Sequence, residues 1–205
     1  MNAKYSYLNL FPSLAHIFDI DEFNKLQNDL IDHVYKLKNQ DPDGHIISNR
    51  KGWQSKSFSL NFDGDVIHTT ILDVLKSFPV IKNTTQMVTT AWINVNFPGA
   101  YNIRHSHPES NLSGVLWVKC PKDSGKIEFF NSKNFETYTE INSYIKEFKD
   151  RNLIHEVYWF EPREGRMIIF PSYLEHQVTE NKSSEDRISI SFNINLTNFR
   201  TGRST

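Results

Sequence analysis

Apolar side chains recur at a helical spacing in the first part of the chain. Between residues 19 and 38 they occupy every third or fourth position, at Phe23, Leu26, Leu30, Ile31, Val34 and Leu37. This spacing predicts an amphipathic helix, for which Asp19 or Asp21 is available as a cap. A second apolar cluster at residues 69–78 predicts a shorter helix, which ends before Pro79 because proline cannot continue helical hydrogen bonding.

From residue 87 onward the period of the pattern changes to two. Short segments rich in Val, Ile and aromatic residues, separated by turn-forming clusters, predict strands at 87–97, 112–120, 126–130, 155–160, 165–170 and 187–196. Aromatic residues make up 13% of the chain, which favours a β-rich core. With one or two strands from the first 65 residues, the pattern predicts an all-β core, an antiparallel sandwich or jelly roll with the two helices packed outside.

Residues 135–149 interrupt the strand pattern. Apolar and aromatic side chains repeat there at intervals of about three, which predicts a helical insertion or lid. The 205 residues contain no internal repeat and no linker long enough to divide them. We therefore expect one domain spanning residues 1–205.

Charge and cysteine content exclude several kinds of partner and site. Lys and Arg number 23 against 24 Asp and Glu, without a long block of one sign, so we expect neither nucleic acid nor a membrane as partner. Cys120 is the only cysteine, which excludes an internal disulfide and a Cys-rich zinc site. The sequence shows neither a signal-peptide pattern nor a long apolar run, so we expect a cytoplasmic protein. Any metal must be bound by His and carboxylate groups.

Two of the eight histidines are spaced as a pair of metal ligands. His105 and His107 follow the turn at Pro98 and Gly99, and in an extended segment alternation places both rings on the same side. Neutral imidazoles are common metal ligands. His176 lies a few residues after the predicted strand that ends at Phe170, where its ring can face the mouth of a barrel.

The last predicted strand separates polar from apolar side chains. Its odd positions are polar from Arg187 to Asn195, and its even positions are apolar from Ile188 to Leu196. If the polar side is only solvated surface, no site follows from it. If that side lines the barrel interior, Arg187 and Ser189 form a carboxylate receptor, because the guanidinium binds both oxygens and the hydroxyl donates another hydrogen bond.

These motifs together resemble the Fe(II)- and 2-oxoglutarate-dependent oxygenases of the double-stranded β-helix fold. More narrowly, the chain is similar to a bacterial and phage family of such oxygenases with the pattern HxHP…SGV…FPSxLxH…RxSxSFN. The matching stretches are LFP (10–12), GWQS (52–55), YNIRHSHPES (101–110), LSGVLWV (112–118), GRMIIFPSYLEHQV (165–178) and RISISFN (187–193). The resemblance implies a double-stranded β-helix, iron held by His105, His107 and His176, and 2-oxoglutarate held through its distal carboxylate by Arg187 and Ser189.

One ligand departs from the superfamily's usual His-x-Asp or His-x-Glu motif. Either His105 and His107 bind with His176, or His107 and Glu109 bind with it and restore a carboxylate. We favour the first set, because the narrower family reads His-x-His-Pro with a variable residue at the place of Glu109. The resemblance also makes Asn94 and Tyr101 candidate hydrogen-bond partners of the cofactor.

The activity implied by the resemblance is that of a dioxygenase. It would couple oxidative decarboxylation of 2-oxoglutarate to succinate with hydroxylation of a small-molecule or protein substrate by O₂. One alternative is a cupin-type metal enzyme without 2-oxoglutarate, because the histidine motifs partly match those of cupins. Another is a non-catalytic ligand-binding jelly roll. Arg187 and Ser189 favour the oxygenase over both alternatives. The sequence leaves open whether the protein forms a homo-oligomer.

Overall fold

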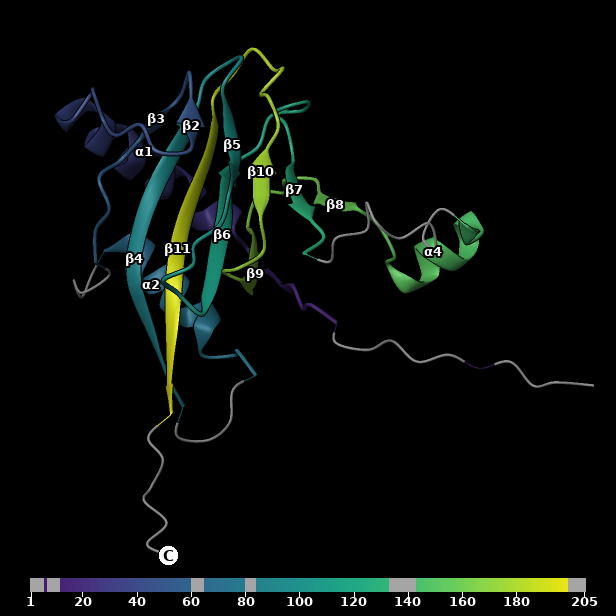
Figure 1. Cartoon of the computed structure of the whole chain (residues 1–205). Coiled ribbons are helices and arrows are strands. Elements are labelled where there is room, and N and C mark those ends of the chain that lie inside the picture. Colours follow the sequence, from purple (N-terminus) through teal and green to yellow (C-terminus); the bar gives the residue numbers. More distant parts are fainter. Residues whose placement is uncertain (1–5, 7–11, 60–64, 80–83, 133–142, 199–205) are drawn as a thin grey trace, which may run out of the picture.

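Two antiparallel sheets form the structure, a computed structural model that describes residues 6, 12–59, 65–79, 84–132 and 143–198 (Figure 1). The six-stranded sheet has the order β1 (His16–Asp19), β9 (Arg166–Pro171), β6 (Leu112–Lys119), β11 (Arg187–Asn198), β4 (Thr84–Asn96), β3 (Trp53–Gln54). The five-stranded sheet has the order β2 (Asn49–Arg50), β5 (Tyr101–His105), β10 (His176–Val178), β7 (Ile127–Phe130), β8 (Val157–Phe160). The expected jelly roll with an all-β core is confirmed.

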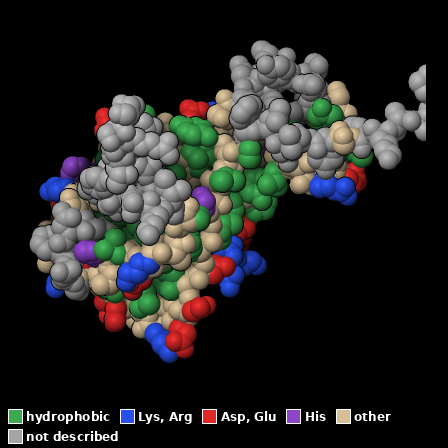
Figure 2. Space-filling model, turned by 90° about the horizontal axis from the view of Figure 1, so that it is seen from below, with side chains coloured by type: hydrophobic (Ala, Val, Ile, Leu, Met, Phe, Trp, Pro, Cys, Tyr) green, Lys and Arg blue, Asp and Glu red, His purple; other side chains and the backbone are tan. Residues whose placement is uncertain are grey.

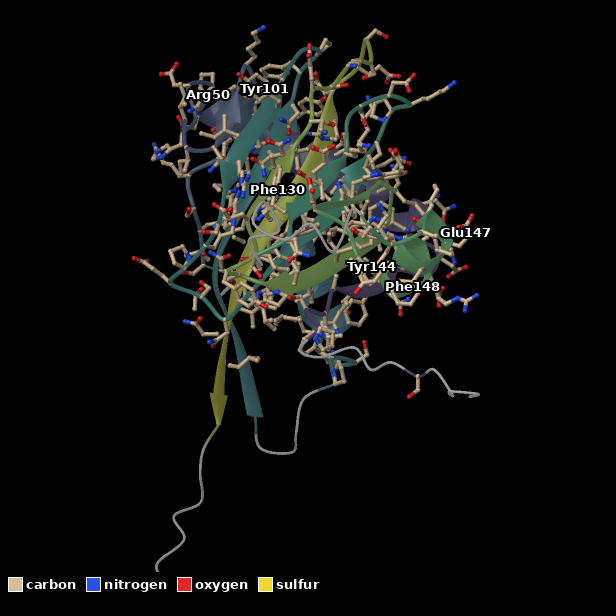
Figure 3. The ribbon with its side chains drawn as sticks, turned by 45° about the vertical axis from the view of Figure 1, so that its right-hand side comes forward. Arg50, Tyr101, Phe130, Tyr144, Glu147 and Phe148 are labelled. Atoms are coloured by element: carbon tan, nitrogen blue, oxygen red, sulfur yellow. The ribbon has the colours of Figure 1, made fainter. Side chains whose placement is uncertain are left out.

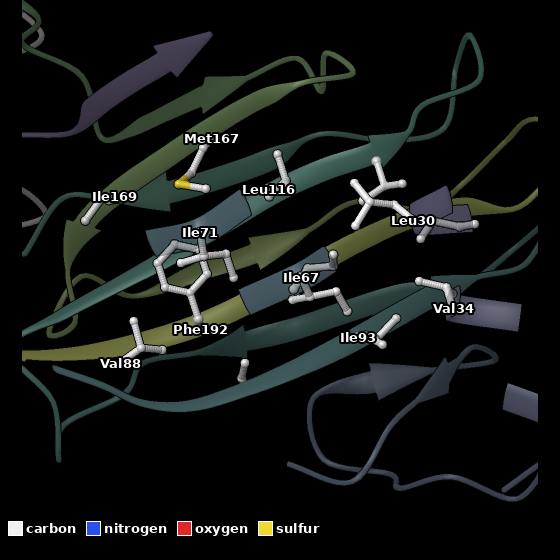
Figure 4. Packing of buried hydrophobic residues seen from close by; sticks show 14 of the residues in the cluster. Leu30, Val34, Ile67, Ile71, Val88, Ile93, Leu116, Met167, Ile169 and Phe192 are labelled. Atoms are coloured by element: carbon white, nitrogen blue, oxygen red, sulfur yellow. The ribbon is translucent and has the colours of Figure 1, made fainter. Parts of the chain in front are cut away.

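Two helices cover the outer face of the six-stranded sheet. Leu30 and Val34 of α1 (Asn24–Gln40) and Ile67 and Ile71 of α2 (Val66–Leu75) are fully buried in one apolar cluster. On the sheet side this cluster contains Ile93, Leu116, Met167, Ile169 and Phe192 (Figure 4). The expected flanking position of both N-terminal helices is therefore confirmed.

Alternation along β11 sorts its side chains between two environments. Ile188, Ile190 and Phe192 are buried in the core beneath the helices, whereas Arg187 and Ser189 line the space between the two sheets. The polar side of this strand therefore faces the interior and not solvent, as required for the carboxylate receptor expected from the sequence.

Helices α1 and α2 begin at other residues than expected, because their N-terminal caps differ from those expected. Asp19 belongs to β1, where it pairs with Arg166 (2.8 Å), and α1 begins only at Asn24 without a side-chain cap. The expectation that Asp19 or Asp21 caps this helix was therefore wrong. Helix α2 begins before residue 69, because the carboxylate of Asp65 accepts a hydrogen bond from the backbone N–H of Ile67 (2.7 Å).

The expected strands are all present, and the structure adds short ones. Strands β10, β2 and β3 have only two or three residues, too short for a periodic pattern to predict, and β5 has five residues that are mostly polar. The described part of the first 65 residues supplies three strands, where one or two were expected. The short strands β5 and β10 hold two histidines of the site.

The expected helical insertion at 135–149 is only partly covered by the structure. Residues 135–142 lie outside the described residues, so the insertion or lid stays a prediction there. Beyond them, α4 (Lys146–Asn152) lies on the far side of β8, and none of its residues is buried (Figure 1). Across the described ranges, no helix combines the length and apolar character needed to span a bilayer. Figure 2 shows acidic and basic side chains interspersed on the face it views, without a large patch of one sign.

Candidate active site

Three histidines meet between the ends of short neighbouring strands. His105 ends β5 and His176 begins β10, and the two residues are direct partners in the antiparallel pair. His107 follows two residues after β5, where its backbone N–H donates to the carbonyl of Ser172 (2.9 Å). One ligand atom from each of the three rings lies within 4.8 Å of the other two. Side chains this close can hold one metal ion between them.

Backbone hydrogen bonds set the tautomer of two of the rings. Nδ1 of His105 lies 2.7 Å from the carbonyl oxygen of Ile103, and Nδ1 of His176 lies 2.9 Å from that of Leu174. A carbonyl oxygen can only accept, so each Nδ1 carries the proton and each Nε2 keeps its lone pair. This is the arrangement in which a histidine binds a metal through Nε2.

All three imidazoles are neutral at physiological pH. Burial and the neighbouring His105 lower the pKa of His107 to about 4, and burial together with both other histidines lowers that of His176 to about 3. Burial also lowers the pKa of His105, against the hydrogen bond to Ile103, which acts to raise it. The cluster is therefore ready to bind a cation without first losing protons.

The carboxylate of the alternative ligand set lies outside the cluster. Glu109 is exposed, in the turn that follows His107. Among the described residues, only His105, His107 and His176 form a group of metal-binding side chains. The geometry thus brings together the first of the two ligand sets considered from the sequence.

Arg187 is buried at the start of β11 without an acidic partner. Its side chain is only 2% exposed, and its guanidinium donates to the carbonyl of Ser124. Burial lowers the pKa of Arg187 to about 10, and no carboxylate of the described residues acts on this pKa through charge. A Cβ on Gly125 would lie 2.9 Å from Nη1 of Arg187, so the glycine gives the guanidinium its room. A buried cation in this position calls for an anionic ligand.

The histidines and Arg187 line one cavity between the two sheets. The cavity is partly open to solvent, and its wall also contains Ser189 and Asn94. Nδ2 of Asn94 donates to Ser191 (3.2 Å), whereas its Oδ1 is buried without a hydrogen-bond partner. The hydroxyl of Ser124, next to Arg187, is also buried and unpaired. The wall therefore retains polar groups that a bound molecule can satisfy.

Tyr101 is the one sequence-predicted site residue on β5 that the structure does not bring to the cavity. Its side chain is 38% exposed, and the neighbouring Asn102 faces the interior instead. Figure 3 shows Tyr101 beside Arg50, its partner across the β2–β5 pair, at the outer edge of the sheet. Neighbouring strand residues point to opposite faces, so Tyr101 lies on the face opposite to Asn102. A register shift between β5 and β10 lies between Asn102 and His105, and both of these residues face the cavity.

A chain of amides along the cavity wall was not expected from the sequence. Nδ2 of Asn96 donates to Asn102 (3.1 Å), whose Nδ2 donates to the hydroxyl of Ser48 (3.1 Å). These bonds join the two sheets next to Arg187, which pairs with Asn96 across β4 and β11. The alternation of Asn94 and Asn96 along their strand was the available signal, because two amides on one face of an apolar strand favour a polar interior.

One protein-family model matches the part of the chain that contains the three histidines and Arg187. A family model described as "Putative 2OG-Fe(II) oxygenase" matches residues 90–193, about half of the chain. No functionally curated protein shows significant similarity to the chain.

Solved structures of oxygenases share the fold at low sequence identity. A prolyl-4-hydroxylase from Pseudomonas putida superimposes with a TM-score of 0.55 at 14% identity, covering 88% of this chain and 91% of that chain. A viral collagen prolyl hydroxylase from Paramecium Bursaria Chlorella virus-1, in complex with 2OG, gives 0.53 at 16%, covering 87% and 94%. HygX from Streptomyces hygroscopicus, with nickel, 2-oxoglutarate and hygromycin B bound, gives 0.61 at 8%, covering 88% and 82%.

Proposed function

The chain belongs to the 2OG-Fe(II) oxygenase family, and from this we propose that it is a dioxygenase that hydroxylates a substrate as 2-oxoglutarate is converted into succinate. Fe(II) and 2-oxoglutarate are its cofactors. The observation that carries the proposal is a buried arginine, without a carboxylate partner among the described residues, in the same cavity as three neutral histidines. When bound, Fe(II) and 2-oxoglutarate supply the oxidising chemistry with O₂, and the protein supplies binding and orientation.

We assign the metal to His105, His107 and His176. Two of these rings have their Nε2 lone pairs set by carbonyl bonds to Nδ1, so the backbone orients the ligands before the metal arrives. Trp92 contacts the third ring, with 5.4 Å between the Trp92 and His107 ring centroids, and restricts its position. The three residues fit a small divalent ion that accepts nitrogen ligands.

We assign the distal carboxylate of 2-oxoglutarate to Arg187 and Ser189. The guanidinium is buried and held on one side by Ser124, so an incoming carboxylate replaces water with charge-assisted hydrogen bonds. Asn94 lies on the same wall, but its unpaired amide oxygen can accept only from a donor of the substrate, because the carboxylates and the ketone of 2-oxoglutarate are themselves acceptors. Tyr101 has no part in this proposal because its side chain lies on the outer face.

Aromatic side chains form the apolar part of the cavity wall. Trp117 and Phe170 line the cavity and are nearly fully buried, and both belong to the apolar cluster between the sheets. A dry wall strengthens the electrostatic interactions of Arg187 and keeps the oxidising chemistry away from solvent.

The proposal is tested by substrate-free turnover of 2-oxoglutarate. Protein loaded anaerobically with Fe(II) and then exposed to O₂ should convert 2-oxoglutarate into succinate, which chromatography measures. His176→Ala should lose at least 90% of this conversion while keeping its circular dichroism spectrum, and His33→Ala, on helix α1, is the matched control that retains it. Metal binding without succinate formation would instead favour the cupin-type alternative.

A further inference from the structure

One turn of the backbone positions two of the three histidines. The turn at residues 172–175 joins β9 to β10, and the carbonyl of Ser172 accepts a hydrogen bond from the backbone N–H of His107 (2.9 Å). Two residues further along the same turn, the carbonyl of Leu174 accepts a hydrogen bond from Nδ1 of His176 (2.9 Å). A displacement of this turn would therefore move the backbone of His107 and rotate the ring of His176 together.

The side chain of Ser172 attaches this turn to the six-stranded sheet. Its hydroxyl lies 2.9 Å from the hydroxyl of Ser113 on β6, and the Ser113 hydroxyl donates to Oδ1 of Asn193 on β11 (2.8 Å). An amide oxygen can only accept, so the single hydroxyl proton of Ser113 is used toward Asn193. The hydroxyl of Ser172 is therefore the donor to Ser113, and the hydrogen-bond chain runs from Ser172 through Ser113 to Asn193.

The hydrogen-bond chain is buried and tied to three strands. Asn193 is the direct pairing partner of Ser113 on β6 and of Thr90 on β4, and its Nδ2 donates to the hydroxyl of Thr90 (3.3 Å). Ser172 is 0% exposed and Ser113 is 2% exposed. Loss of one member leaves a buried polar group without its partner, so the chain favours a single arrangement of the turn relative to the sheet.

The proposed function gives these three side chains no role of their own. They are the serines of SGV and FPS and the asparagine of SFN, three parts of the sequence pattern that resembles the oxygenase family. The support matters most for His107, which lies outside the strands, two residues after β5, whereas the other two histidines are strand residues. Its backbone bond to Ser172 connects this histidine to the hydrogen-bond chain.

We propose that Ser172, Ser113 and Asn193 are positioning residues of the metal site, which act through the turn at 172–175 without being ligands. This inference rests on the proposed function, because it requires that the three histidines bind the metal. Outer partners that orient metal ligands change metal affinity by about 10–100-fold when they are removed. Loss of one hydroxyl of the chain therefore weakens metal binding although all three imidazoles are still present.

Calorimetric titration with Ni(II) tests the proposal. Ser113→Ala and Ser172→Ala should each weaken Ni(II) binding about tenfold. The double variant should bind about as weakly as either single variant, because both changes break the same chain. Ser113→Thr keeps the hydroxyl, and the cavity that Ser113 lines leaves room for the added methyl group, so its affinity should stay within about threefold of the wild type.

Ser55→Ala is the matched control. Ser55 is also a buried serine, whose hydroxyl accepts from the backbone N–H of Ile93 (2.9 Å) and donates to the carbonyl of Lys56 (2.8 Å), but it does not line the cavity. Its loss should lower the free energy of unfolding in urea and leave Ni(II) affinity unchanged. The control thus separates a loss of stability from an effect on the metal site.

Three results would overturn the proposal: wild-type Ni(II) affinity in both Ser113→Ala and Ser172→Ala, losses that add in the double variant, or an equal loss in Ser55→Ala. If the variants of the two buried serines do not fold, the half-buried Asn193 is replaced by Ala instead. Weakening of about tenfold in Asn193→Ala supports the proposal, and wild-type affinity overturns it. Failure of the wild-type protein to bind Ni(II) would count against the proposed function itself.

Discussion

Individual side chains in the site are set by the backbone that surrounds them. His105 and His176 owe their tautomers to the carbonyls of Ile103 and Leu174, each two residues earlier in the chain. Gly125 leaves room for the guanidinium of Arg187. The chemistry of the site therefore depends on residues that carry no reactive group.

The identity of the third metal ligand is the first prediction at this scale. His105→Ala should reduce Ni(II) affinity at least tenfold, because it removes one of three nitrogen donors, whereas Glu109→Gln should change it less than twofold, because Glu109 is exposed and outside the cluster. Calorimetric titration with Ni(II) measures both. Strong metal binding by His105→Ala together with weak binding by Glu109→Gln would assign the ligand to Glu109.

The second prediction at the scale of residues concerns the pH dependence of stability. The pKa values of His107 and His176 fall to about 4 and about 3 in the folded metal-free protein, from an ordinary value near 6.5. The unfolded chain therefore binds protons that the folded chain does not, and stability is lost as pH falls from 6.5 towards 4. At pH 5.5 the loss is roughly 1 kcal/mol for each fully shifted histidine.

Urea unfolding of the metal-free protein at pH 7.5 and pH 5.5 measures this loss. His107→Asn removes one of the shifted groups, so the difference in the free energy of unfolding between the two pH values should be smaller in this variant. An equal difference in both proteins would show that His107 ionises normally in the folded state.

At the scale of elements, strand β11 links the core to the site. Ile188, Ile190 and Phe192 hold it beneath the helices, and this fixes the register that turns Arg187 and Ser189 into the cavity. The alternation that predicts this arrangement is visible in the sequence, because a long strand buried on one face repeats with a period of two. Strands of two or three residues, such as β10, have no such signal, and the pairing of His105 with His176 depends on contacts between distant segments.

Gly114 of β6 tests the packing behind this strand. A Cβ at this position would lie 2.3 Å from the ring of Phe192, so Gly114→Ala should destabilise the fold by about 1–3 kcal/mol through overpacking. Replacing Phe192 by Leu in the same protein makes room, so the double variant should be more stable than the sum of the two single changes predicts. Chemical denaturation of the four proteins measures the coupling, and strict additivity would contradict the contact.

At the scale of the whole molecule, the site joins the two sheets. The five-stranded sheet supplies His105 and His176, and the six-stranded sheet supplies Arg187 and Ser189. Sequence motifs predicted this set of residues, and the jelly roll explains how segments far apart in the chain meet. The motifs did not predict that Tyr101 lies on the outer face, or that the amides of Asn96 and Asn102 join the two sheets. Both features depend on the register of β5.

The affinity of the metal-loaded protein for 2-oxoglutarate tests the central claim most directly. Loss of a buried guanidinium–carboxylate pair costs on the order of 2–5 kcal/mol, so Arg187→Ala should weaken 2-oxoglutarate at least tenfold, and Arg187→Lys should recover only part of it because lysine lacks the planar fork. The exposed Arg163, replaced by Ala, is the matched control, and Ni(II) binding by every variant confirms an intact metal site. Unchanged 2-oxoglutarate affinity in Arg187→Ala, measured by calorimetry, would contradict the assignment of this cavity to 2-oxoglutarate.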